Sequence, residues 1–150
     1  MELKRGAAES TLDDKGRVNI PVRFRQYFQG ELVITRGMEH YALIMTPSAW
    51  ERYEQAFRNA DKFNPEERLI LEDKYLNQAQ VVEIDKAGRI AIPPTLRKYA
   101  NLTRDCLIIR VENRLSIWDS DAFEAYLLEK DELAKTAMNK LDPNEIFRAG

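Results

Sequence analysis

Residues 13–28 read DDKGRVNIPVRFRQYF, and residues 85–100 read DKAGRIAIPPTLRKYA. The second stretch repeats the first at an offset of 72 positions (85 − 13 = 72). Between windows 12–28 and 84–100, seven positions are identical: Asp13/Asp85, Gly16/Gly88, Arg17/Arg89, Ile20/Ile92, Pro21/Pro93, Arg25/Arg97 and Tyr27/Tyr99. A repeat at a fixed offset has to be interpreted before single residues, and two copies are too few for a solenoid. The repeat therefore predicts one domain with internal pseudo-two-fold symmetry.

The similarity continues beyond the motif in both halves. The first copy is followed by ELVITRGMEHYALIMT and PSAWERY, and the second by DCLIIRVENRLSIWD and SDAFEAY. We expect residues 1–60 to form the first repeat, 61–79 a linker helix, and 80–150 the second repeat with a long C-terminal helix. The expected order in each half is strand, tight turn, strand, short helix, hairpin and helix.

Glycine, proline and capping residues mark the turns and helix starts of this pattern. Gly16 and Gly88 can take the positive φ that a tight turn requires. A proline that has no N–H to donate ends the second strand of each motif. Thr46-Pro47 and Asn64-Pro65 each look like an N-cap followed by proline at the first helical position, and Glu67 completes a capping box with Asn64.

Composition places the chain among globular proteins, with 44% hydrophobic and 32% charged residues and a net charge of −2. A net negative charge argues against a generally basic nucleic-acid binder. The local charge differs, because 15–28 and 86–98 contain basic residues and no acids, whereas 119–150 contains eight acids and four bases. Binding depends on the local field rather than on the total charge. Solvated strand and helix faces are the alternative explanation for such clusters.

The sequence offers little for catalysis or for metal binding. His40 is the only histidine and falls in a predicted hairpin turn. Cys106 is the only cysteine, lies in the apolar run CLII, and is expected in the core of a cytoplasmic protein. No phosphate-binding glycine loop, nucleophile elbow or metal-ligand spacing is present. We therefore expect no enzyme, no cofactor, no metal, no small-molecule substrate and no membrane partner.

The repeated D-x-x-G-R motif is the part of the sequence whose charged side chains can pair with each other or bind a ligand. Asp and Arg four positions apart in a short turn can form a charge-assisted clasp, within one chain or across a subunit boundary. Alternatively, the arginine, with Lys15 beside it, can bind DNA phosphates or guanine edges. From these residues alone the clasp is slightly favoured.

With its flanking residues, D-x-x-G-R-[V/I]-x-I-P-x-x-[F/L]-R resembles the signature of AbrB/SpoVT-type swapped-hairpin DNA-binding domains. Two copies, together with LVITRG, PSAW and LSIWD, make the chain similar to the MraZ transcriptional regulators, from Arg5 to about Tyr126. The resemblance implies a mixed α and β fold in which two pseudo-symmetric halves share a β-barrel-like core.

The resemblance also implies a function. It predicts a nucleoid-associated repressor that forms a ring-like homo-oligomer and binds double-stranded DNA at direct repeats in the promoter of the division and cell-wall gene cluster. The family's DNA-contacting arginine matches Arg17, and the neighbouring basic positions that we assign to DNA are Lys15, Arg5, Arg23 and Arg25. Asp13, Gly16, Asp85, Gly88 and Arg89 are assigned to structure or oligomer contact.

A second hypothesis is a protein-interaction module like the antitoxins built on the same hairpin scaffold. Its partner site would be the acidic C-terminal helix and the tail LDPNEIFRAG, residues 141–150. Two motif copies and a structured second half count against it.

Overall fold

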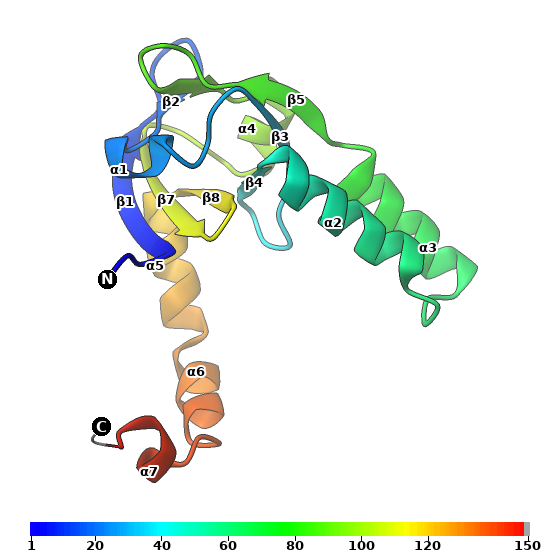
Figure 1. Ribbon diagram of the computed structural model, residues 1–150, viewed down its shortest axis with the longest axis vertical. Helices are drawn as coiled ribbons and strands as arrows, with labels where there is room; N and C mark the ends of the chain where they lie inside the picture. Colours follow the sequence, from blue (N-terminus) through cyan, green and yellow to red (C-terminus); the bar gives the residue numbers. More distant parts are fainter. Residues whose placement is uncertain (149–150) are drawn as a thin grey trace. The chain divides into compact units, whose positions relative to one another are not determined.

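The computed structural model describes residues 1–148, so the last two residues of the expected tail lie outside it. These residues form two compact units, one of residues 1–120 and one that starts at Asp121. Figure 1 shows the elements of each unit, and none of the described helices is long and apolar enough to cross a membrane.

Both repeats follow the expected order of elements. The first contains β1 (Arg5–Thr11), β2 (Arg17–Asn19), α1 (Val22–Arg25), β3 (Glu31–Arg36), β4 (Ala42–Met45) and α2 (Pro47–Asn59). The linker contains α3 (Pro65–Leu71) and the π-helical turn η1 (Glu72–Leu76). The second repeat contains β5 (Gln80–Glu83), β6 (Arg89–Ala91), α4 (Pro94–Tyr99), β7 (Asp105–Val111), β8 (Arg114–Asp119) and α5 (Ser120–Glu129).

The larger sheet mixes strands of the two repeats. Its order is β1-β7-β8-β4-β3-β5, and every neighbouring pair is antiparallel. β1 of the first repeat pairs with β7 of the second, from Arg5 opposite Val111 to Thr11 opposite Asp105. At the other edge, β5 of the second repeat pairs with β3 of the first. Each repeat therefore supplies the outer strand beside the other repeat's hairpin.

The two motif copies pair with each other in a separate two-stranded ribbon. Val18 in β2 lies opposite Ile90 in β6, and these two residues are equivalent in the repeat. The Ile20 amide donates to the Gly88 carbonyl at 2.7 Å, and the Ile92 amide donates to the Gly16 carbonyl at 2.9 Å. This reciprocal pairing is the centre of the predicted pseudo-two-fold symmetry.

The expected β-barrel-like core is not confirmed, because the six-stranded sheet is not closed and has β1 and β5 at its edges. Single bridges, Leu12 to Val18 and Ile84 to Ile90, join these edges to the small ribbon. The tight turn directly after each bridge limits the pairing to one residue pair.

One core lies between the sheet, the ribbon and the short helices α1 and α4. Its buried members come from both repeats and include Val18, Phe28, Leu32, Ile34, Ile90, Leu96, Cys106, Ile108 and Ile117. Burial of apolar area is the main stabilising contribution to such a fold. Cys106 is fully buried, as predicted, and burial raises the pKa of its thiol to about 11.

The helix starts were predicted better than the helix lengths. Thr46 caps α2 and Asn64 and Glu67 form the capping box of α3, both as expected. Within the expected linker, residues 61–79, the helix begins at Pro65, changes to a π-helical turn at Glu72 and ends at Leu76.

The prediction of a single long C-terminal helix was wrong. The second unit has three helices in succession, because the helix breaks at Lys130 (φ −95°, ψ 7°) and again before Pro143. After α5 come α6 (Asp131–Met138) and α7 (Pro143–Ile146), and the Asp142 side chain caps α7.

Candidate nucleic-acid interface

The first D-x-x-G-R turn contains the predicted clasp. One oxygen of the Asp13 carboxylate accepts the backbone amides of Lys15 at 2.9 Å and Arg17 at 2.8 Å. The other oxygen accepts the Nε–H of Arg17 at 2.7 Å. The backbone hydrogen bond from Arg17 is the main cause that lowers the pKa of the Asp13 carboxyl, and the Arg17 side chain adds to it. Asp13 therefore holds the turn and the arginine together.

The second turn repeats this arrangement. The Asp85 carboxylate accepts the backbone amides of Ala87 and Arg89, both at 2.9 Å, and the Nε–H of Arg89 at 3.0 Å. The backbone hydrogen bond from Arg89 lowers the pKa of this carboxyl as well. The two clasps are thus nearly equivalent in geometry, and the turns differ at the two positions between, where Asp14 and Lys15 are replaced by Lys86 and Ala87.

The clasp and a DNA contact are compatible, because only one edge of each arginine is used. Asp13 takes the Nε of Arg17, and within the described residues the two terminal nitrogens of Arg17 make no hydrogen bond. The Arg17 side chain is 28% exposed and that of Arg89 is 37% exposed. A guanidinium fixed at Nε can still donate from its terminal nitrogens to a phosphate or to a guanine edge. Both interpretations of the motif can therefore hold for the same residue.

The ribbon places the two arginines on one face. Side chains alternate along a strand, so Val18 and Ile90 point into the core while the flanking residues point outward. The outward residues are Arg17 and Asn19 on β2 and Arg89 and Ala91 on β6, with the two arginines at diagonal positions. A two-stranded antiparallel ribbon has the width that the major groove of B-DNA admits.

Each turn is covered by an arginine from the other repeat. Gly16 (φ +78°) lies against the guanidinium of Arg97, and Gly88 (φ +82°) lies against that of Arg25. A Cβ at either glycine would clash with that guanidinium and would also place a side chain in the left-handed region. The two glycines are therefore required both by the turn and by the crossing arginines.

The structure does not bring all five predicted DNA-binding residues together. Lys15 is exposed in the first turn beside Arg17, whereas Arg25 lies against the second turn. Arg23 is exposed and donates to the Ala7 carbonyl at 2.6 Å. Arg5 is the first residue of β1, about 20 Å along a seven-residue strand from the first turn. Lys15 and Arg17 thus form the compact part of the predicted site, and the role of the other three stays a prediction.

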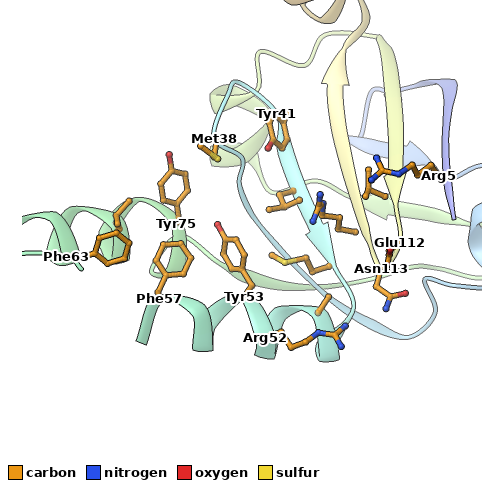
Figure 2. Close-up of a pocket in the computed structure, with 16 residues that line it drawn as sticks. Arg5, Met38, Tyr41, Arg52, Tyr53, Phe57, Phe63, Tyr75, Glu112 and Asn113 are labelled. Carbon is orange, nitrogen blue, oxygen red and sulfur yellow. The ribbon is translucent and has the colours of Figure 1, made fainter. Parts of the chain in front are cut away.

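Arg5 instead lines an aromatic groove with a volume of about 920 Å³ (Figure 2). One end of the groove is lined by aromatic side chains from α2, η1 and the segment before α3, namely Tyr53, Phe57, Phe63 and Tyr75. Arg5 lies at the other end with Glu112 and Asn113 (Figure 2), and Arg52 and Arg114 also line the groove. Burial raises the pKa of Tyr53 to about 12. No signal in the sequence predicted this groove.

The residues with catalytic potential are not assembled into a site. His40 is exposed, and its Nδ1 lies 3.1 Å from the Tyr99 carbonyl oxygen. Within the part of the chain that the structure describes, no group of His, Cys, Asp or Glu could hold a metal ion.

Comparison with protein families agrees with this geometry. The family described as "MraZ protein, putative antitoxin-like" matches residues 3–73 and 75–142. The chain belongs to the MraZ family. The family's two matched segments correspond to the two repeats, and they meet near the end of the linker helix. The MraZ family is of regulator type rather than enzymatic, which agrees with the expectation from the sequence.

Two features of this MraZ chain were not predicted from its sequence. The crossing of Arg25 and Arg97 depends on β2 pairing with β6, which no local pattern specifies, although both arginines are identical in the repeat. The second feature is the side chain of Asn19, which accepts from Arg25 at 2.9 Å. Ala91 stands at the equivalent position of the second repeat, and this difference in the sequence indicates that the two copies of the motif are not identical in their hydrogen bonds.

Proposed function

We propose that the chain is a sequence-specific DNA-binding transcriptional regulator. It represses by binding direct repeats in the promoter of the division and cell-wall gene cluster, and it acts as a ring-like homo-oligomer. The observation that carries the proposal is Arg17, which is fixed at Nε by Asp13 and has its terminal nitrogens available on the outer face of a two-stranded ribbon. Membership of the MraZ family supports it.

The oligomer supplies the affinity that one turn lacks. A single ribbon with two arginines neutralises few phosphates, so its binding alone is weak. Several ribbons held in one assembly contact repeated DNA sites together, and this multivalency raises the avidity without new contacts. The direct repeats in the DNA thus provide several binding sites, and the subunits of the ring provide the several ribbons that bind them at the same time.

Arg17→Ala is expected to abolish specific binding to promoter DNA that contains the repeats. Each subunit loses a contact of about 1–3 kcal/mol in base discrimination, and the loss recurs in every engaged subunit. Fluorescence anisotropy at two salt concentrations measures the binding, and native mass spectrometry and circular dichroism verify that oligomer size and secondary structure are unchanged. Equal binding by wild type and Arg17→Ala would refute the assignment.

Arg89→Ala is the matched comparison, because Arg89 has the same clasp but has Ala87 at the position that Lys15 takes in the first turn. We expect this variant to disturb assembly more than base recognition. A smaller loss of DNA binding than for Arg17→Ala, together with altered oligomer size, supports this division of labour between the repeats.

The aromatic groove favours a second candidate function, a protein-interaction module. Its aromatic end and its arginines Arg5, Arg52 and Arg114 fit a peptide with apolar anchors and an acidic end. This candidate agrees with the antitoxin-like description of the family. A doubly substituted chain, Tyr53→Ala with Phe57→Ala, separates the two functions. Unchanged promoter binding by this variant shows that DNA recognition does not need the groove, and loss of regulation despite normal DNA binding favours the partner.

A further inference from the structure

Arg25 and Arg97 are equivalent in the repeat but differ in their hydrogen bonds. Arg25 donates from Nε to the Ile20 carbonyl at 2.8 Å and from a terminal nitrogen to the Asn19 side chain at 2.9 Å. The Nε of Arg97 is buried and has no hydrogen-bond partner among the described residues. Two arginines in the same architectural position are therefore satisfied to different degrees.

The sequence accounts for part of this difference. Asn19 supplies the side-chain oxygen for Arg25, and its counterpart in the other repeat is Ala91, which has no polar side chain. Arg97 thus lacks the acceptor that fixes Arg25. An arginine keeps its charge in a protein, so it is stabilised by acceptors. The Nε of Arg97 is buried out of reach of an external acceptor, so such an acceptor can bind Arg97 only through its terminal nitrogens.

The surroundings of Arg97 provide access for an external acceptor. Arg97 lies against Gly16 of the first turn, and its side chain lines a shallow hollow beside that turn. The other lining residues are Leu12, Asp13, Asp14, Pro94, Lys98, Asn101, Leu102 and Thr103. Lys98 adds a second positive charge, and Asn101 adds a side-chain donor, whereas the Thr103 hydroxyl already donates to Asp119 at 3.2 Å. The Asp13 carboxylate is already occupied by Arg17, so Asp14 is the one unpaired acid that faces the hollow.

We propose that Arg97, assisted by Lys98, binds a phosphate of the DNA backbone beside the first turn. Arg25, which the sequence assigned to DNA contact, is held by Ile20 and Asn19 and supports the second turn instead. This inference rests on the proposed DNA-binding function. Arg17 and Lys15 then contact the groove while the second repeat contributes the adjacent phosphate contact. Phosphate contacts fix the register of a protein on DNA, and base contacts specify the sequence. The first-turn site is thus built from both repeats.

The test compares Arg97→Gln with Arg25→Gln in the full chain. Losing one phosphate contact in each engaged subunit lowers the slope of log K against log salt by about 0.9 per engaged subunit. A fourfold rise in salt should therefore weaken wild type more than Arg97→Gln, by a factor of about 3.5 for each engaged subunit. We also expect Arg97→Gln to bind roughly tenfold more weakly per engaged subunit at low salt, which is the effect of one charge-assisted hydrogen bond. Arg25→Gln should retain the wild-type slope, and equal slopes for both variants would overturn the proposal.

Ala91→Asn and Asn19→Ala form a second, matched pair that keeps both arginines. Ala91→Asn gives Arg97 the internal acceptor that Asn19 gives Arg25, so we expect weaker DNA binding with a reduced salt slope. Asn19→Ala removes that acceptor from Arg25 and should leave the slope at or above the wild-type value. Asp14→Asn should strengthen binding, because it removes an unpaired negative charge from the hollow. An unchanged slope in Ala91→Asn would count against the proposal.

A measurement without DNA separates this inference from the proposed function. In the wild-type chain, titration with inorganic phosphate is followed by NMR at the arginine Nε–H resonances. The Arg97 resonance is expected to shift and the Arg25 resonance to stay, whether or not promoter DNA binds. Phosphate that shifts neither resonance, or both equally, contradicts the inference, and failure of promoter DNA to bind contradicts only the proposed function.

Discussion

Asp13 and Asp85 each bind an arginine through Nε rather than through its terminal nitrogens. This choice of atom leaves the outer end of the guanidinium able to meet another acceptor. It also pre-orders the side chain, so less rotamer entropy is lost when the arginine binds DNA. The repeated aspartate is therefore a positioning residue for the arginine that follows it.

The two aspartates should make stability depend on pH in the acid range. Their pKa values are lowered in the folded chain, mainly by the backbone hydrogen bonds from Arg17 and Arg89. Their stabilising contribution is therefore present above the unfolded pKa near 3.8 and is lost as the pH falls through the folded value. We expect the double variant Asp13→Asn with Asp85→Asn to lose less stability than wild type between pH 5 and about 2.

Thermal melts of both proteins across this range provide the measurement. Other carboxylates titrate in both proteins, so the informative quantity is the difference between the two melting curves. Parallel pH profiles would show that the clasps do not contribute.

The sequence predicted the residue-scale features that depend on neighbours in the chain. The positive φ of Gly16 and Gly88 and the Asp–Arg clasp follow from four or five consecutive residues. The crossing of Arg97 over Gly16 joins residues 81 positions apart (97 − 16 = 81), so local chemistry does not specify it.

Three elements begin with the same signal, a polar N-cap followed by proline. Thr46-Pro47, Asn64-Pro65 and Asp142-Pro143 start α2, α3 and α7, and in each case the first side chain accepts from the backbone of the new helix. The first two helix starts were predicted from this signal. The same signal at Asp142-Pro143 marks a new helix and contradicts a single long C-terminal helix in its last part.

Two other element boundaries have no such signal. The break at Lys130 has neither glycine nor proline, and Asp131 directly after it has only a low helix propensity in an interior position. The π-helical turn at Glu72–Leu76 takes part in a tertiary contact, in which the buried Thr35 hydroxyl donates to the Tyr75 carbonyl at 2.5 Å. Helix propensity depends on the local sequence and cannot predict a contact with a distant strand.

The capping box at Asn64 should contribute measurably to the stability of the linker. Its side chain accepts from the Glu67 amide at 2.8 Å, and the Glu67 carboxylate accepts from the Asn64 amide at 2.9 Å. We expect Asn64→Ala to reduce the free energy of unfolding by about 1 kcal/mol. Urea denaturation measures this loss, with Glu66→Ala as the control because Glu66 lies outside the box. An equal effect of the two substitutions would contradict the assignment.

At the scale of the whole first unit, neither repeat has a complete sheet of its own. β1 depends on β7 and β5 depends on β3, so each repeat is completed by the other. The sequence predicted this mutual dependence from the pseudo-symmetry. It did not predict the strand order or the open edges, because repeat similarity identifies equivalent strands but not their partners.

The shared core should therefore unfold as one unit. Leu32 is fully buried in β3 of the first repeat, and we expect Leu32→Ala to cost about 2–5 kcal/mol. Native-state hydrogen exchange should show a similar loss of protection for amides of β3 and for those of β7 and β8. Leu133→Ala, in the exposed part of α6, is the control and should leave these amides unaffected. Loss of protection confined to β3 and β4 would indicate independent halves.

The pairing of β1 with β7 also has a consequence for biosynthesis. Arg5 is translated among the first residues, and its partner Val111 follows 106 residues later (111 − 5 = 106). At about 5–20 residues per second, the ribosome needs roughly 5–20 s to deliver that partner. During this interval β1 lacks β7 and β4 lacks β8, whereas β3 lacks β5 only until residue 83 has been made. The six-stranded sheet therefore cannot be completed until β7 and β8 have been made. The first repeat cannot finish folding while it alone has been synthesised, so most of the folding in the cell takes place late in translation or after it.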